Sequence, residues 1–221
     1  MESAEPRSNR RDEIVAAAGE LFSARGYHGT SMRDLAKRLE LRGSSLYAHF
    51  DSKDDVLWAI VASAAAAFVA AADGVPRELA PTARLEGLVA GHLRVIRGEL
   101  PYATVFFQDW IHLSDKRRGL LVAMRDDYQR RFHEVIAAGV ELREFAVEDV
   151  ALATLVVLSA LNFSHQWLKP SGRLGHDELA TAFTAQLLNG LRGPLHDAES
   201  PREAENPQPT LARAVLAGTR S

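Results

Sequence analysis

Apolar residues recur every three or four positions along most of this chain, which is the spacing of one face of an α-helix. From Asn9 to Arg25 they follow this spacing, and Gly26 then ends the pattern. The same periodicity predicts further helices over residues 52–72, 81–98, 101–113, 114–139, 147–168 and 176–191. No stretch shows the strict alternation expected of a half-buried strand. The pattern therefore predicts an all-α protein.

Two short helices and a tight turn are predicted between Thr30 and Lys53. Ser31 and Asp34 have the spacing of a capping box, which starts the first helix. Residues 40–43 leave little room for the chain to reverse before a second helix that carries Leu46. This arrangement is a helix-turn-helix, and the helix from Asn9 to Arg25 would complete a three-helix domain.

The second helix of a helix-turn-helix enters the major groove of DNA with its N-terminus first. Residues at its start are therefore candidates for base contacts, and the residues that flank it are candidates for phosphate contacts. The predicted DNA-binding residues are Thr30, Ser31, Arg33, Arg42, Gly43, Ser44, Ser45, Tyr47, His49 and Lys53. Arg42 can bond a guanine edge with two hydrogen bonds. Lys53 follows the helix cap Ser52 and should meet the DNA backbone.

These residues resemble the tetracycline-repressor (TetR) family of bacterial regulators. The resemblance is carried by Ile14, Ala17, Leu21, Phe22, Gly26, Tyr27, Thr30, Ser31, Leu35, Ala36, Leu46, Tyr47, Phe50, Lys53 and Leu57. It implies a homodimeric regulator, most often a repressor, with an N-terminal helix-turn-helix domain and a larger helical domain for ligand binding and dimerisation. The family usually has Ser or Thr where this chain has Arg42, so the second helix should lack its common side-chain cap.

The patterns divide the chain into four parts. Residues 1–8 are predicted to be disordered, 9–53 to form the helix-turn-helix domain, and 54–191 to form the ligand-binding and dimerisation domain. From residue 192 the composition shifts to Pro, Glu and Ala, which cannot bury enough apolar surface to become ordered. Residues 192–221 are therefore predicted to be a mobile tail.

The helices predicted over 147–168 and 176–191 are apolar on more than one side. One bundle cannot cover all of these faces, so the pair is predicted to form a homodimer interface as a four-helix bundle from two chains. The alternative is that both helices belong to the core of one chain. A dimer would place two recognition helices on a palindromic, double-stranded DNA operator.

The family resemblance also implies a ligand pocket enclosed by the helices between residues 52 and 139. The predicted ligand-binding residues are Phe106, Phe107, Trp110, Tyr128, Phe132, Phe163, Gln166, Trp167, Lys169 and Arg173, with Asn162 and His165 as further polar anchors. For each aromatic residue the alternative is ordinary core packing. A large apolar effector would suit such a lining.

One short segment gives a clue to the class of effector. Trp167, Lys169, Pro170 and Gly172 resemble a W-x-[RK]-P-x-G turn found in a branch of the family that responds to coenzyme A thioesters of fatty or steroid-derived acids. This resemblance implies an acyl-CoA effector, with Lys169 and Arg173 beside an aromatic ring for a nucleotide phosphate. The alternative is a plain helix-ending turn next to the dimer interface.

Charge and composition limit the other classes of protein. The net charge is −3, so any DNA contact must come from a local cluster of cations and not from a basic domain. The absence of cysteine excludes disulfides and Cys-ligated zinc and fits a cytoplasmic protein. The uncharged stretch over 56–72 is rich in Ala and flanked by acids, so it is predicted to be a buried helix and not a membrane span.

No pattern in the sequence indicates a catalytic residue, a metal site or a bound cofactor other than the small-molecule effector. The eight histidines include no pair three or four positions apart on one helix, and the motifs of hydrolases, P-loop proteins and dinucleotide-binding proteins are missing. The protein is therefore predicted not to be an enzyme. The remaining alternatives are a helical binding protein for apolar ligands and an adaptor without specific DNA binding.

Overall fold

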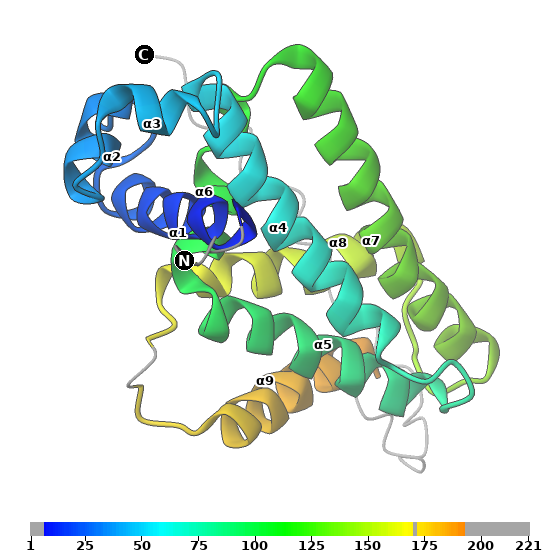
Figure 1. Ribbon diagram of the computed structural model, residues 1–221. Coiled ribbons are helices and arrows are strands. Elements are labelled where there is room, and N and C mark those ends of the chain that lie inside the picture. The colour runs from blue at the N-terminus through cyan, green and yellow to red at the C-terminus, as the bar shows by residue number, and fades with distance from the viewer. Residues whose placement is uncertain (1–6, 170–171, 193–221) are drawn as a thin grey trace, which may run out of the picture.

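A computed structural model describes residues 7–169 and 172–192 of the chain (Figure 1). These residues form α1 (Arg7–Arg25), α2 (Met32–Arg38), α3 (Gly43–Tyr47), α4 (Lys53–Asp73), α5 (Pro81–Gly98), α6 (Leu100–Gln108), the 3₁₀ turn η1 (Trp110–His112), α7 (Asp115–Glu141), α8 (Val150–Phe163), the 3₁₀ turn η2 (Ser164–Gln166) and α9 (His176–Leu191). The described residues contain no strand, so the prediction of an all-α fold is confirmed. Residues 193–221 of the tail predicted over 192–221, and residues 1–6 of the N-terminal segment predicted over 1–8, lie outside this description.

The first three helices form a compact unit at the upper left of Figure 1. The predicted capping box is present, because the Oγ of Ser31 accepts from the N–H of Asp34 at 3.2 Å while Asp34 accepts from the N–H of Ser31 at 2.8 Å. Glu40 has a φ of 55° in the left-handed region. This turn lets the N–H of Leu41 donate to Ala36 at 2.9 Å, which ends α2 and reverses the chain into α3.

The long helix α4 leaves this unit and runs through the centre of the molecule (Figure 1). Among the described residues, it is the one helix whose length and composition would allow it to cross a membrane. It packs against α1, α5, α6 and α7, and its buried side chains include Val56, Leu57, Ile60 and Val61. Its apolar composition is thus explained by contacts within the fold.

The remaining helices surround the far half of α4. In Figure 1 α7 runs along one side of the molecule, while α9 lies against α5. A Cβ at Gly139 would lie 2.1 Å from Cδ2 of Phe145, so the loop after α7 can fold back over the helix only at glycine. This close approach starts the reversal that leads into α8.

Several predicted boundaries differ from the structure by two residues or more. The helix predicted over 147–168 ends at Phe163 and is followed by η2, and the helix predicted over 114–139 extends to Glu141. The first helix begins at Arg7 and not at Asn9, within the usual variation of helix ends. The helix predicted over 101–113 ends at Gln108 and continues as η1. The helix predicted from residue 147 begins at Val150, because the side chain of Asp149 accepts from the N–H of Leu152 at 3.0 Å and caps the helix there.

Candidate DNA-contact surface and ligand cavity

The N-terminus of α3 presents an open surface. Residues 42–45 are all exposed, while Leu46 is fully buried and holds the helix on the domain. Arg42 is the N-cap of α3 but makes no side-chain cap hydrogen bond, as its sequence predicted. No atom lies within 4 Å of the position that a Cβ would take at Gly43. The start of α3 can therefore approach another molecule without a steric barrier.

Two of the predicted DNA-binding residues have partners inside the domain. Thr30 is only 1% exposed, and its hydroxyl donates to the carbonyl of Gly26 at 3.2 Å. Its side chain is therefore structural, and we leave it out of the proposed DNA-contact set. The Nζ of Lys53 donates to the carbonyls of Tyr27 at 2.9 Å and Thr30 at 3.0 Å, and lies 4.0 Å from the ring centroid of Tyr27. Lys53 thus ties α4 to the loop before α2 and keeps one N–H for a further acceptor.

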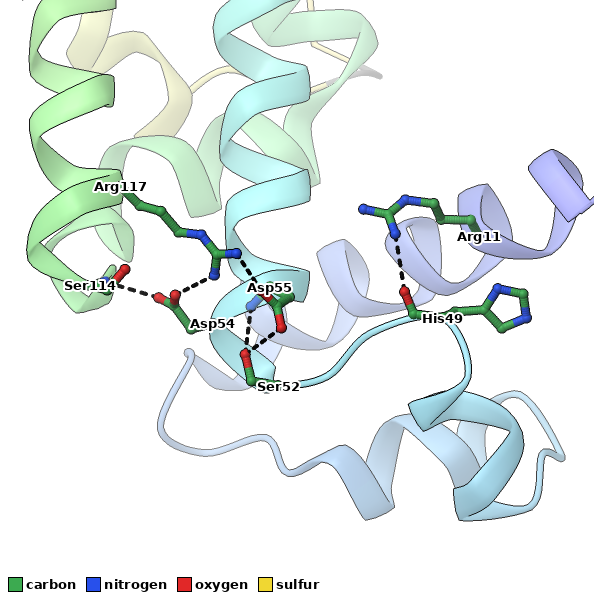
Figure 2. A network of polar contacts seen from close by, with 7 residues as sticks. All are labelled: Arg11, His49, Ser52, Asp54, Asp55, Ser114 and Arg117. Carbon is green, nitrogen blue, oxygen red and sulfur yellow. Dashed lines mark hydrogen bonds and ion pairs between the residues drawn. The ribbon is translucent and has the colours of Figure 1, made fainter.

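The other predicted residues of this surface remain accessible. Ser31, Arg33 and Tyr47 are exposed, and His49 is partly exposed. The backbone carbonyl of His49 accepts from the guanidinium of Arg11 at 3.1 Å (Figure 2). This bond fixes the end of α3 to α1. Within the described residues, neither Arg33 nor Arg42 makes an ion pair, so both cations can face an external anion.

A polar network joins the first turn of α4 to the first turn of α7 (Figure 2). Arg117 on α7 forms ion pairs with both Asp54 and Asp55 on α4. The backbone N–H of Ser114 also donates to Asp54 at 3.0 Å. Hydrogen bonds from Ser52, and then those from Arg117, lower the pKa of Asp55. The first turn of α4, which directly follows the helix-turn-helix, is therefore fixed to α7, the longest helix of the described chain.

A second junction connects η1 to the loop after α1. The imidazole nitrogens of His28 and His112 lie 3.2 Å apart, and the ring of His112 stacks on Tyr27 with centroids 5.4 Å apart. The N–H of Tyr27 lies 3.4 Å from a carboxylate oxygen of Asp109, whose pKa is raised by burial. The segment that follows α6 is thus in direct contact with the DNA-binding unit.

A cavity of about 230 Å³ lies between α4, α5, α6, α7 and α8. It is lined by Ala65, Phe68, Val69, His92, Phe106, Phe107, Met124, Arg125, Tyr128, Gln129, Leu155, Leu158, Ser159 and Asn162. Three predicted ligand-binding residues line it, namely Phe106, Phe107 and Tyr128, together with the predicted anchor Asn162. The lining is mainly apolar and contains no carboxylate.

The other predicted ligand-binding residues do not line this cavity. They are Trp110, Phe132, Phe163, Gln166, Trp167, Lys169 and Arg173. Phe132 is fully buried in the core, whereas Phe163 is 64% exposed on α8. Trp167 stacks on Phe183 of α9, with ring centroids 6.1 Å apart. Helical periodicity places Phe132 and Phe163 on apolar faces but does not tell which neighbour each face meets, and Lys169 and Arg173 lie between helices.

Ten of the lining residues were not predicted from the sequence, and two of these ten, His92 and Arg125, are ionisable. His92 on α5 is 1% exposed, and burial lowers its pKa to about 3. Arg125 on α7 donates to the carbonyl of Phe106 at 2.8 Å and lies over the rings of Phe106 and Trp110, 4.6 and 4.3 Å from their centroids. Burial lowers the pKa of Arg125 to about 10, so it remains a cation at neutral pH. The signal that could have indicated His92 is its place as a histidine among the apolar positions of α5.

The described residues contain no group of three or more His, Asp or Glu side chains that could hold a metal ion. The fold and the two surfaces instead define a class of protein, namely a helical DNA-binding regulator with an internal ligand cavity. Residues 14–60 match the family model for bacterial regulatory proteins of the tetR family, and residues 78–191 match the model for the tetracyclin repressor-like C-terminal domain. The second match covers more than half of the chain. The protein belongs to the TetR family and is a helix-turn-helix transcriptional regulator.

Similar proteins cover nearly the whole of this chain. It is 28% identical over 195 residues to the HTH-type transcriptional repressor KstR2 of Rhodococcus jostii, which spans 85% of this chain and 94% of that protein. The crystal structure of the TetR family regulator PfmR of Thermus thermophilus matches with a TM-score of 0.75 and 33% identity, over 80% of this chain and 97% of that one. AibR, solved with isovaleryl coenzyme A and operator DNA, shares the fold with a TM-score of 0.75 at 23% identity, over 81% of this chain and 98% of that one.

Proposed function

We propose that this protein is a homodimeric repressor that leaves a palindromic operator when a mostly apolar effector, an acyl-CoA, enters the cavity between α4 and α8. One observation carries this proposal: the cavity is lined by Ala65, Phe68 and Val69 of α4, the helix that begins in the DNA-binding unit. A change in the cavity can therefore reach α3 through one continuous helix.

We assign the DNA contacts to the exposed residues around α3. Arg42, Gly43, Ser44 and Ser45 would meet base edges in the major groove. Ser31, Arg33, Tyr47, His49 and the free N–H of Lys53 would meet phosphates on either side. The support is their exposure and the absence of a carboxylate partner for either arginine among the described residues.

The dimer interface is assigned to α8 and α9. On α8, Leu152, Val156 and Phe163 are 58%, 58% and 64% exposed. Side chains of this size gathered on one helix are unusual on the surface of a monomer and typical of an interface. A second copy of the chain is the natural occupant because two DNA-binding units are needed to read a palindrome.

The cavity limits the part of the effector that it can enclose. A cavity of about 150 Å³ holds benzene, so 230 Å³ would enclose an apolar group only somewhat larger. AibR was solved with a coenzyme A thioester whose acyl group has a short branched chain. By analogy, the acyl group of an acyl-CoA would occupy the cavity here while its nucleotide stays outside. Lys169 and Arg173 are exposed and would bind its phosphates.

In this mechanism the effector binds one arrangement of α4 more tightly than the other. Its entry shifts α4 relative to α7 and so changes the separation of the two recognition helices. A palindromic site then no longer fits both at once, and DNA affinity falls by the same factor by which DNA weakens effector binding.

The test is a mobility shift on DNA from upstream of the protein's own coding region. It is repeated with isovaleryl-CoA, hexanoyl-CoA and palmitoyl-CoA, with the matching free acids, and with free coenzyme A. A specific shift that only thioesters abolish supports the whole proposal. A specific shift that no thioester disturbs removes the effector class alone. If neither this DNA nor a selection from random DNA gives a specific shift, the DNA-binding assignment is overturned in favour of an apolar-ligand carrier or adaptor.

A further inference from the structure

One of the residues that line the cavity has a buried polar atom without a hydrogen-bond partner. His92 is almost completely buried, and its Nδ1 lies 3.1 Å from the hydroxyl of Tyr128. Its second ring nitrogen, Nε2, has no hydrogen-bond partner. Both residues line the cavity. A buried, unpaired nitrogen is costly to a fold, so its persistence at the wall of a cavity points to a partner that arrives from outside the chain.

The contact with Tyr128 determines whether Nε2 of His92 is a hydrogen-bond donor or an acceptor. No other hydrogen bond of the Tyr128 hydroxyl is found among the described residues, and burial raises the pKa of that phenol. If the hydroxyl donates to Nδ1, the phenol proton has a partner, and the single N–H proton of the neutral imidazole is on Nε2, which is then a donor. The opposite tautomer would leave both the phenol proton and Nε2 unpaired. The first arrangement satisfies more buried groups, so Nε2–H is a free donor.

A cation on the neighbouring turn reinforces this polarity. Arg125 lies three residues before Tyr128 on α7, on the same helix face, and also lines the cavity. Its guanidinium rests on the rings of Phe106 and Trp110 and makes no ion pair within the part of the chain that the structure describes. With no carboxylate on the lining, the cavity offers donors and positive charge and would repel a cationic ligand.

We propose that His92 and Tyr128 form the polar anchor of the cavity, where the Nε2–H of His92 donates to a neutral carbonyl oxygen of the effector. This inference rests on the proposal that the cavity holds the effector, and it names the chemistry that the effector must carry. The ligand has an apolar body, a carbonyl acceptor and no positive charge. Arg125 favours further electron-rich groups beside that carbonyl.

The tautomer can be tested without any ligand. Nitrogen-15 NMR of the imidazole groups of the wild type, with His92 assigned through its proximity to the rings of Phe68 and Tyr128, reports which ring nitrogen is protonated. We expect a neutral ring with its proton on Nε2 and with Nδ1 as the acceptor. A proton on Nδ1 would overturn the proposal, because the cavity would then present an acceptor.

The ligand chemistry is tested with acetophenone and α-methylstyrene, which have nearly the same shape and differ by a carbonyl oxygen in place of a methylene group. The two differ in hydrophobicity, so the measured quantity is the ratio of their affinities by calorimetry in each variant. The His92→Asn amide can still meet Tyr128 but does not reach the position of Nε2, whereas the longer His92→Gln amide does. We expect the ratio to shift about tenfold against the ketone in His92→Asn and to stay near the wild-type value in His92→Gln.

An unchanged ratio in His92→Asn, or no binding of either probe to the folded wild type, would overturn the anchor. Circular dichroism first confirms that both variants fold, and the NMR result stands if they do not. Mobility shifts of the wild-type protein without effector separate the two proposals, because operator binding by the wild type tests the regulator and does not involve the anchor. Intact operator binding with an unchanged ratio removes the anchor alone. A changed ratio without any operator binding keeps the anchor and removes the regulator.

Discussion

At the scale of single residues, Arg42 is where sequence preference for DNA should reside. Its side chain is exposed, and it does not cap α3. Replacing it with alanine should cost about 1–3 kcal/mol of binding to the operator and relax the preference at one base pair. Competition mobility shifts with singly substituted operators and with random DNA measure both effects. Equal losses on specific and random DNA would contradict the assignment.

Lys53 should behave differently because its ammonium group bonds two carbonyls within the domain. In Lys53→Met these carbonyls lose a charged donor, so we expect the free energy of unfolding to fall by about 1–2 kcal/mol. DNA binding should weaken alike on all sequences. Urea unfolding measures the first effect, and Arg33→Met, which has no such partners, is the matched control. Equal stability of Lys53→Met and wild type would show that the two hydrogen bonds contribute nothing measurable.

His92 should make the protein sensitive to acid. Burial lowers its folded-state pKa to about 3 from the ordinary 6.5. Between these values the unfolded chain binds the extra proton, so stability rises with pH and is lost as pH falls from 6.5 toward 3. Compared with His92→Gln, the wild type should lose about 1.4 kcal/mol more per pH unit in this window. Taking the difference removes the contribution of carboxylates such as Asp55, and parallel curves would contradict the burial effect.

At the scale of elements, α6 and α7 both connect the cavity to the DNA-binding unit. The helix α6 supplies Phe106 and Phe107 to the cavity and packs on α1, and η1 follows it with His112 beside His28. On α7, Arg125 and Tyr128 line the cavity, while Arg117 near its start holds α4. A ligand that displaces either helix therefore acts on the base of the helix-turn-helix.

The ion pairs of Arg117 should carry part of this coupling. In Arg117→Gln the first turn of α4 is less firmly tied to α7, so a shift of the cavity wall is transmitted less completely. We expect the coupling between effector and DNA to fall by about 1 kcal/mol, or roughly fivefold in the effector concentration that releases the operator. Mobility shifts titrated with the releasing thioester measure this change. Arg130→Gln is the control, because Arg130 pairs with Asp127 within α7 itself, and an equal effect of both substitutions would refute the role of the junction.

At the scale of the whole molecule, the described chain leaves an apolar face on α8 uncovered and carries only one recognition helix. The proposed two-fold dimer would cover this face and supply the second recognition helix. The proposed domain boundary at residue 53 falls at the first residue of α4, so one helix serves both domains. The helix α8 also lines the cavity through Leu155 and Leu158, so the proposed dimer geometry and the cavity shape are linked through α8.

Charges introduced on α8 should dissociate this dimer. Leu152→Glu combined with Val156→Glu places carboxylates on exposed apolar positions, so the fold should survive while the interface does not. We expect a monomer by analytical ultracentrifugation and an operator affinity reduced by roughly a hundredfold, because one half-site contact set is lost. Ala123→Glu, at an exposed position of α7, is the control. A double variant that remains a dimer would move the interface elsewhere.

Local sequence determined much of this protein by itself. The Ser31–Asp34 capping box and the bounds of α5 and α9 were predicted because each depends on residues within a few positions of one another. The all-α fold followed from the helical periodicity along most of the chain, and the family resemblance followed from motifs in the first sixty residues. Both are properties of residues close together in sequence.

Only the tertiary structure decided which side chains line the cavity. His92 and Arg125 are far apart in sequence but line the same cavity, because α5 and α7 both pack against α4. Phe163 and Trp167 have the same apolar character as the cavity residues but face outward, since periodicity defines a face without naming its neighbour. From the sequence, Lys53 was predicted to meet the DNA backbone. In the structure its ammonium group also donates to the carbonyls of Tyr27 and Thr30. In each case the outcome depends on contacts between distant segments, which the packing of the helices fixes and the local pattern does not.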